Sequence, residues 1–500
     1  MSQEINHLEP TALWKNFINL NQIPRASKNE EKAIAFVMNF GRQLGLETEK
    51  DNTGNVIIRK PATIGLEDRK AVILQAHLDM VHQKNNDTTF NFDQQGIQMF
   101  IDDDWVRAHG TTLGADNGIG VAAMLAVLAA DDIAHPKLEA LFTVDEETGM
   151  TGATGLDKDK LQGEILLNLD TENDEEICIG SAGGLDISAT KTFREVAVVP
   201  SAEIYNLSVK GLRGGHSGMD IHRGLANANK IMNRILYELN RQAEIQIIDI
   251  QGGSLRNAIP RESVATIAIT SSDENTVNDL VENISASLRH EFQTTEPSLQ
   301  ILAEKLPYRE TKAMNADDQK QLLNALYAAP NGVYAMSADF DNLVLSSNNL
   351  AIVSVANGTI DIQSLTRSSL DSSKTDLANT LRAAFELMAA KVEFSGSYPG
   401  WQPNPDSEIL SVLAQIYKEQ NNRDANIMAV HAGLECGILG EKYPHLDKIS
   451  FGPTILGAHS PDERVSIKSV QKFWAFLVEI LKNIPLKKDQ AEQKEQAASK

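Results

Sequence analysis

The sequence predicts an α/β fold in which a mostly parallel sheet has helices on both faces, with an α+β domain inserted into the chain. Short, near-continuous apolar segments alternate with helical ones, at 55–59, 71–76, 138–144 and 165–169. Strands of this kind are typical of a parallel sheet that is buried on both faces. After about residue 186 the pattern changes to strand, helix, strand, strand, helix, which indicates a separate domain.

The first clear element is a helix, predicted from about residue 28 to residue 44. Ser27 and Glu30 have the spacing of a capping box, and Gly45 stands where the helix should end. An Asp-Asn-Thr-Gly turn at 51–54 then precedes the first strand.

The later elements divide the chain into regions. The inserted domain is predicted from strands and helices at 207–212, 227–239, 245–250, 264–270 and 274–292. The turn-rich sequence SGSYPGWQPNPDS marks the return to the first sheet, which is completed by segments at 408–419, 448–451 and 466–481 and by a strand ending at His431. We therefore expect a discontinuous first domain at 1–186 and 400–485, an inserted domain at 187–399 and a disordered tail at 486–500.

Composition and charge exclude several classes of function. The 500 residues are 42% hydrophobic and 23% charged, which is in the globular range. With 68 Asp and Glu against 46 Lys and Arg, the net charge of -22 disfavours nucleic acid and anionic membranes as partners. The sequence has two distant cysteines and no secretory signal, and its most apolar segment is too short to span a bilayer. We therefore expect a cytoplasmic protein without disulfides.

Polar side chains stand at the ends of the predicted strands. The strand at 71–76 runs into His77-Leu78-Asp79, and because side chains alternate along an extended chain, His77 and Asp79 point the same way. A metal-binding imidazole is commonly held by a carboxylate on its second nitrogen, so this pair suits a ligand and its orienter. A surface histidine beside an acid is the other interpretation.

Asp116 stands among small residues immediately before an apolar helix. One interpretation is a helix N-cap, with Asp116 or Asn117 as the acceptor. The other is a metal ligand, because a carboxylate at a glycine-rich turn can offer one oxygen to each of two ions. The surrounding glycines do not match a phosphate-binding loop.

More acids follow two other strands. The strand at 138–144 ends in Asp145, Glu146 and Glu147, and the strand at 165–169 ends in Asp170. Adjacent carboxylates repel, so burying them together is costly unless cations neutralise them. A solvated acidic loop is the alternative for the three consecutive acids.

A histidine much later in the chain completes this set. His459 lies in a loop rich in Gly and Pro, where a rigid scaffold can display a functional side chain. His77, Asp116, Glu147, Asp170 and His459 each stand at or just beyond a strand end of one inferred sheet, where ligands of α/β proteins gather. The set predicts one metal site.

Longer motifs around these residues resemble the dinuclear zinc exopeptidases of the aminoacylase and carboxypeptidase type, in their aminoacyl-histidine dipeptidase branch. The resemblance runs from Leu13 to about Pro485 and rests on QAHLDMV, GTTLGADNGIG, the Glu-Glu pair, GLRGGHSGMDIH, GGSLRNAIPRE, YPGWQPNPDS, HAGLECG and GPTILGAHSPDE. It implies a catalytic domain of the zinc-exopeptidase type with an inserted lid domain.

The resemblance also implies a set of metal ligands. His77 and Asp170 would bind one zinc ion, Glu147 and His459 would bind the other, and Asp116 would bridge them, with Co²⁺ or Mn²⁺ as substitutes. Two zinc ions carry a charge of +4 against -3 from the carboxylates, and the remaining +1 favours deprotonation of a bridging water.

Further roles follow from the same resemblance. The bridging hydroxide would be the nucleophile, Glu146 the general base, and Asp79 the residue that holds the His77 ring. The peptide bond between Asp116 and Asn117 is expected to be cis.

The inserted domain would contribute substrate contacts. The resemblance implies that His216 stabilises the developing oxyanion, that Asn257 and Arg367 contact the substrate carboxylate, and that Gly433 lets the substrate approach the backbone. The carboxypeptidases of the wider family have a Gly-Thr-Asp type sequence at this last position, and Gly433-Leu434-Glu435 departs from it. This departure favours the dipeptidase branch.

The predicted function is hydrolysis of unblocked dipeptides, with a preference for Xaa-His substrates including β-Ala-His. A broader di- or tripeptidase or an aminoacylase is the near alternative, and a non-catalytic metal- or peptide-binding relative is the distant one. The resemblance favours a homodimer.

Overall fold

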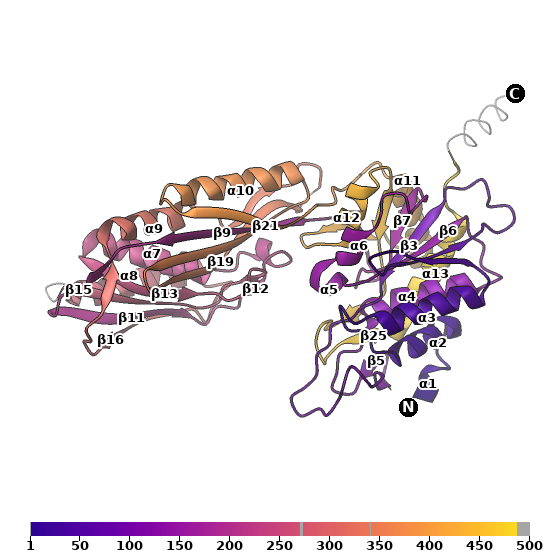
Figure 1. Cartoon of the computed structure of the whole chain (residues 1–500), viewed down its shortest axis with the longest axis horizontal. Coiled ribbons are helices and arrows are strands. Elements are labelled where there is room, and N and C mark those ends of the chain that lie inside the picture. The colour runs from indigo at the N-terminus through magenta and orange to yellow at the C-terminus, as the bar shows by residue number, and fades with distance from the viewer. Residues whose placement is uncertain (1, 271–273, 341, 488–500) are drawn as a thin grey trace, which may run out of the picture. The chain divides into compact units, whose positions relative to one another are not determined.

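The computed structural model describes residues 2–270, 274–340 and 342–487, and these form two compact units (Figure 1). Of the described residues, the first unit holds 2–180, 403–429 and 435–487. The second unit holds residues 181–402 and 430–434. The sequence pattern placed the boundaries at 186 and 400, and it did not indicate that the short segment 430–434 belongs with the second unit.

The first unit is built on an eight-stranded sheet in the order β1-β2-β6-β3-β7-β23-β8-β22. The neighbours β6 (Leu138–Thr143), β3 (Val72–His77), β7 (Ile165–Asn168) and β23 (Asp447–Ser450) are parallel. The flanking strands β1 (Glu47–Lys50), β2 (Val56–Lys60) and β8 (Glu176–Ser181) pair antiparallel, and β22 (Asn426–Val430) forms the far edge. Strands β3, β6 and β7 are buried along their whole length, as the apolar segments predicted.

Helices surround this sheet, and α4 packs against β3 while α2 packs against α4 (Figure 1). The helices of the unit are α1 (Ser2–Ile5), α2 (Thr11–Asn21), α3 (Glu31–Gln43), α4 (Ala115–Ala129), α5 (Glu146–Gly149), α6 (Thr151–Gly155), α11 (Glu408–Asn421), α12 (Glu435–Lys442) and α13 (Ile467–Lys482).

A smaller antiparallel sheet of the first unit joins distant parts of the chain. Its strands are β4 (Met99–Asp102), β5 (Trp105–Ala108), β25 (Arg464–Ser466) and β24 (Ile455–Leu456). The connection between β24 and β25 is the loop that carries His459, so this sheet anchors that loop to the segment that follows β3.

The capping box predicted for the helix at 28–44, which is α3, is wrong. Helix α3 begins at Glu31, and the side chains of Ser27 and Glu30 bind elsewhere. The Ser27 hydroxyl donates to Asp79 Oδ2 over 2.8 Å, and Glu30 Oε1 accepts the N–H of Asp145 over 2.9 Å. Both side chains therefore hold the loops that follow β3 and β6. At the other end of the helix, Gly45 follows the last residues as predicted, with φ at 69°.

The second unit is built on an antiparallel sheet in the order β16-β11-β15-β13-β19-β20-β9-β21, with β18 paired to β19. Its strands are β9 (Gly183–Thr192), β11 (Ala202–Lys210), β13 (Ile245–Gly252), β15 (Ser263–Thr270), β16 (Gln300–Leu306), β18 (Gly332–Met336), β19 (Val344–Ala356), β20 (Thr359–Ser368) and β21 (Lys391–Tyr398). Two short pairs, β10 (Glu195–Ala197) with β17 (Lys312–Met314) and β12 (Gly215–His216) with β14 (Ala258–Ile259), lie outside this sheet.

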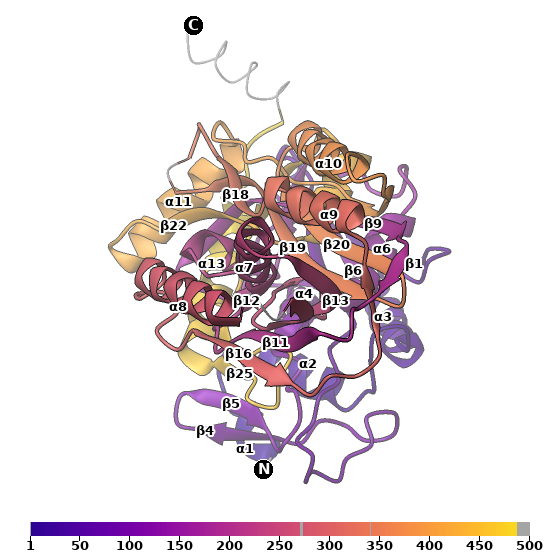
Figure 2. The same ribbon diagram turned by 90° about the vertical axis from the view of Figure 1, so that its left-hand side faces the viewer.

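Helices form a second layer of this unit. Figure 2 shows α8 (Glu274–Glu291), α7 (Ala228–Gln242), α9 (Ala316–Ala328) and α10 (Asp371–Glu386) following one another over the sheet. One apolar core, which includes Leu236, Leu322, Phe385, Ile267 and Ile362, lies between the two layers. The alternating burial of the strands follows from this arrangement, because only one face of each strand meets the helices.

The end of the chain differs in part from the predicted disordered tail at 486–500. Leu486 pairs with Arg69, and the N–H of Lys487 donates to the Asp68 carbonyl over 3.0 Å. Residues 488–500 lie outside the described part of the chain. Within the described residues, no helix is both long enough and apolar enough to cross a bilayer.

Candidate functional site

The predicted ligands come together at the carboxyl ends of the parallel strands. His77 is the last residue of β3, Asp170 lies just beyond β7, and Glu147 lies in α5, directly after β6. Asp116 is placed by the first turn of α4, and His459 by the loop between β24 and β25. All five belong to the first unit.

Two groups of ligand atoms share one carboxylate. His77 Nε2 lies 3.1 Å from Asp116 Oδ1 and 3.4 Å from Asp170 Oδ1. His459 Nε2 lies 3.2 Å from Asp116 Oδ2 and 3.0 Å from Glu147 Oε2. Within each group the candidate ligand atoms lie within 4.8 Å of one another. Asp116 thus presents one oxygen to each group. His77 and Glu147 also lie close together, because both belong to a further group with Glu146 whose ligand atoms lie within 4.8 Å of one another.

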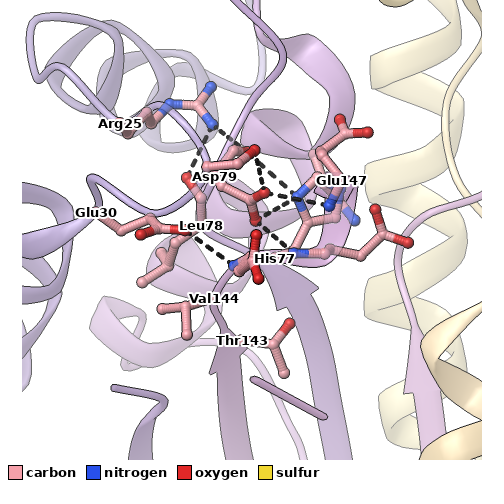
Figure 3. Close-up of polar contacts among 12 residues, drawn as sticks. Arg25, Glu30, His77, Leu78, Asp79, Thr143, Val144 and Glu147 are labelled. Atoms are coloured by element: carbon pink, nitrogen blue, oxygen red, sulfur yellow. Dashed lines mark hydrogen bonds and ion pairs between the residues drawn. The ribbon is translucent and has the colours of Figure 1, made fainter. Parts of the chain in front are cut away.

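Asp79 organises the loops around His77 and the two glutamates (Figure 3). Its Oδ1 lies 3.4 Å from His77 Nδ1, and its two oxygens accept the N–H groups of Glu146 and Glu147 over 3.1 and 3.2 Å. Burial opposes ionisation of Asp79, but the hydrogen bonds from His77 and Ser27 hold its pKa at about 2. The side chain therefore stays a carboxylate that accepts the Glu146 N–H, and His77 Nδ1 also lies 3.2 Å from the Asp79 backbone carbonyl oxygen.

The segment around Asp116 is irregular. The peptide bond from Asp116 to Asn117 is cis, which confirms the expectation from the resemblance. Gly114 occupies the N-cap position of α4 with φ at 71°, and the backbone of Asp116 and Asn117 inside α4 is non-helical. The two oxygens of Asp116 face His77 and His459. The Asn117 amide donates to Asp170 Oδ1, so it helps to orient a second ligand.

Arg25, which the sequence did not single out, is fully buried beneath this centre. Its Nη1 donates to the carbonyls of Leu78 and Asp79 over 3.0 Å each, and its Nη2 donates to the Gly114 carbonyl over 2.6 Å (Figure 3 labels Arg25, Leu78 and Asp79). Burial lowers the pKa of Arg25 to about 10, which leaves it charged at neutral pH. One side chain thus ties the loop after β3 to the start of α4.

His216 lies in the second unit with its protonation state defined by its neighbours. Its Nδ1 accepts the N–H groups of Gly218 and Met219 over 3.2 and 3.0 Å. Burial and the charge of Arg367 lower the pKa of His216 to about 4. At neutral pH the ring is therefore neutral, and its proton is on Nε2, because Nδ1 is an acceptor.

The other predicted substrate contacts also lie in the second unit. Arg367 lies on β20 and is buried. Its Nη1 donates to the Tyr398 hydroxyl over 2.9 Å. Its Nε and Nη2 each lie 3.4 Å from Ser217 Oγ. The Asn257 carbonyl accepts the N–H of Ser217 over 2.8 Å. The polar atoms of Ser217 and Tyr398 therefore hold the Arg367 guanidinium and the turn after His216 in place.

Gly433 belongs to the segment 430–434, which the structure groups with these residues. A Cβ atom on Gly218 would lie 2.0 Å from the His431 carbonyl oxygen, so this segment packs directly against the turn that follows His216. The imidazole of His431 is buried, with its Nε2 2.7 Å from Ser347 Oγ. His216, Arg367 and the segment of Gly433 are thereby brought into one region of the second unit.

Comparison with known proteins shows the family to which this chain belongs. The chain matches the peptidase family M20/M25/M40 over residues 73–483. The chain belongs to this family. It is accordingly a hydrolase of peptide bonds, and the family is metal-dependent.

Members of the family resemble the chain over almost its whole length. A protein named cytosol non-specific dipeptidase, from Escherichia coli, is 43% identical over 484 residues, which are 97% of this chain and 100% of that protein. The crystal structure of an aminoacylhistidine dipeptidase from Vibrio alginolyticus matches with a TM-score of 0.91 and 42% identity, over 97% of this chain and 100% of the other. An aminopeptidase from Bacillus cereus, at 16% identity over 95% and 99% of the two chains, shares the fold with a TM-score of 0.56.

The residues of this M20-family centre fit divalent metal ions. Two imidazoles and three carboxylates are a nitrogen and oxygen donor set suited to zinc and similar ions. Glu147 Oε1 is buried and has no hydrogen-bond partner among the described residues. Burial raises the pKa of Asp170 to about 6, although the neighbouring His77 acts to lower it. A cation within each group would supply both the missing partner and the missing positive charge.

We predict that the His216 imidazole titrates near pH 4, instead of near its ordinary value of about 6.5. Because the folded pKa is lowered, the contribution of neutral His216 to stability is complete above pH 6.5 and is lost as the pH falls through about 4. NMR of the protein with labelled histidines, assigned by comparison with His216→Gln, measures this value. A midpoint near 6.5 would contradict the assigned tautomer and its two backbone hydrogen bonds.

Proposed function

We propose that the protein hydrolyses the peptide bond of unblocked dipeptides with two divalent metal ions. We propose zinc as the metal, because the nitrogen and oxygen donor set suits it. His77, Asp116 and Asp170 would hold one ion, and Asp116, Glu147 and His459 the other. The observation that carries the proposal is the position of Asp116, whose two oxygens face two different groups. When bound, the ions would activate water and polarise the carbonyl of the substrate.

Glu146 is the proposed general base. It precedes the ligand Glu147, and its backbone N–H is held by Asp79 over 3.1 Å. Its side chain lies close enough to His77 and Glu147 to form a group with them. Burial raises the pKa of Glu146, which makes it a better proton acceptor. It would take a proton from the attacking water and deliver it to the leaving amine.

The second unit would supply the remaining contacts to the substrate. His216 is a neutral imidazole with Nε2–H as its donor, which suits stabilisation of a developing oxyanion. Arg367, with Asn257 and the backbone at Gly433, would bind the C-terminal carboxylate, because a planar guanidinium can pair with both of its oxygens. This division of roles explains why the substrate should have a free C-terminus.

Two related activities differ in the breadth of the substrates accepted. The relative from Vibrio alginolyticus is named an aminoacylhistidine dipeptidase, and the relative from Escherichia coli a cytosol non-specific dipeptidase. We propose Xaa-His, including β-Ala-His, as the preferred class, with broad dipeptide hydrolysis as the second candidate. A cytoplasmic location and a homodimer complete the proposal.

A panel of substrates separates these activities. We expect β-Ala-His and Ala-His to be hydrolysed with a higher kcat/KM than Ala-Ala, and N-acetyl amino acids to be poor substrates. Equal values for the three dipeptides would favour the broad dipeptidase. Fast turnover of only the acetylated compounds would contradict the dipeptidase proposal, and no turnover of any substrate by the metal-loaded protein would favour a non-catalytic relative.

Glu146 and Glu147 provide a matched pair of substitutions. We predict that Glu146→Gln keeps the wild-type metal content and loses at least ~10²-fold in kcat, because only the proton carrier is removed. Glu147→Gln should lose metal, since Glu147 is a ligand in the proposal. Metal ions per chain after gel filtration and kcat on Ala-His are the two measurements. Wild-type turnover in Glu146→Gln would remove Glu146 from the mechanism.

A further inference from the structure

Glu463 makes an unusual set of contacts close to the metal ligands. Its side chain is buried, and its two oxygens accept four consecutive backbone N–H groups. Oε2 lies 2.7 Å from the N of Leu113 and 2.9 Å from the N of Gly114. Oε1 lies 2.7 Å from the N of Ala115 and 3.3 Å from the N of Asp116.

These four N–H groups belong to the segment that leads into α4, around the N-cap residue Gly114 and ahead of the non-helical backbone of Asp116 and Asn117. Like the first donors of a helix, they have no helical carbonyl as a partner. No side chain of the helix itself caps them among the described residues. A carboxylate suits this position because it only accepts hydrogen bonds and carries the charge that a helix N-terminus favours. A glutamine at 463 would present an NH₂ group to two of these donors.

Glu463 also belongs to the loop that carries His459. The N–H of Glu463 donates to the Ser460 carbonyl over 3.0 Å, and the N–H of Ser460 donates to the Gly457 carbonyl over 3.2 Å. The loop is closed on itself by these turns and by the pairing of β24 with β25. One carboxylate therefore connects the backbone of the shared ligand Asp116 with the loop of His459.

Arg25 holds the same stretch of backbone from its carbonyl side. Its Nη2 donates to the Gly114 carbonyl over 2.6 Å, and a Cβ atom at Gly114 would lie 2.5 Å from that nitrogen. Glu463 binds the N–H side of the same residue. The backbone that leads into Asp116 is thus fixed on both sides by buried charged groups.

We propose that Glu463 is a positioning residue of the metal centre, which fixes the direction of the Asp116 carboxylate relative to His459 before any ion binds. The inference rests on the two-metal function proposed above. Loss of the four hydrogen bonds to Glu463 would leave the five proposed ligands in place, but it would let the Asp116 carboxylate move. The metal affinity would fall, because the ions would then have to order the segment 113–116 themselves.

A matched control distinguishes positioning from a general contribution to folding. Glu139 is also fully buried in the first unit, and its Oε2 accepts the N–H groups of Gln162 and Gly163 over 2.8 and 3.0 Å. Glu139 lies near the start of β6, whereas the proposed ligand Glu147 lies beyond the end of this strand. Glu139→Gln should therefore destabilise the protein without reaching the metal centre.

The test is a zinc titration of the chelator-treated full chain, with a competing chelator of known affinity. We expect Glu463→Gln to bind zinc 10–100-fold more weakly than the wild type, the usual range for residues that orient ligands, and Glu139→Gln to bind it as the wild type does. The visible spectrum of the Co²⁺-loaded protein should change only in Glu463→Gln. A loss of thermal stability with wild-type zinc affinity and Co²⁺ spectrum would overturn the proposal, whereas a wild type that binds no zinc would overturn the two-metal function instead.

A measurement on the unaltered chain covers the case in which Glu463→Gln does not fold. Hydrogen exchange of the amides at 113–116 is followed by mass spectrometry with and without zinc. We expect these amides to be protected in the metal-free protein, because Glu463 is already bound to them. Rapid exchange that slows only on addition of zinc would show that the metal orders this segment, and the proposal would fail.

Discussion

The proposed centre depends on one carboxylate that faces two groups of candidate ligands. The two oxygens of Asp116 lie 3.1 Å from His77 Nε2 and 3.2 Å from His459 Nε2. A rotation of this side chain would move both oxygens together, so neither group can adjust independently of the other. The backbone that carries Asp116 is therefore the part of the molecule where rigidity matters most, and the buried contacts of Arg25 and Glu463 converge on it.

The pKa values of Asp79 and Asp170 differ because their hydrogen-bond donors and their charged neighbours differ. Asp79 accepts the Ser27 hydroxyl and two backbone N–H groups, and its pKa stays at about 2. Asp170 is less completely buried and has the Asn117 amide and His77 beside it. Burial and the neighbouring carboxylates of Asp116 and Glu147 raise its pKa to about 6. Fixed protein donors thus settle the charge of Asp79, whereas in the proposed centre a cation would settle the charge of Asp170.

The sequence predicted the parts of the structure that follow from periodicity and from strand ends. Apolar segments located β3, β6 and β7 within about a residue, and the rule that ligands gather at the carboxyl ends of parallel strands brought His77, Glu147 and Asp170 to one edge. The capping box failed because spacing alone does not tell whether Ser27 and Glu30 bind their own helix or a loop distant in sequence. The contacts of Arg25 and Glu463 could not be predicted from the sequence for a similar reason, because both side chains bind backbone atoms that are distant in the chain. The placement of 430–434 with the second unit likewise depends on close packing against Gly218, which no local pattern records.

The most direct test of the two-metal centre is an anomalous difference map from crystals of the zinc-loaded protein, collected on both sides of the zinc edge. We expect two peaks, one between His77, Asp116 and Asp170 and one between Asp116, Glu147 and His459, with an oxygen of Asp116 directed at each. A single peak, or two peaks that do not share Asp116, would contradict the proposed two-metal centre.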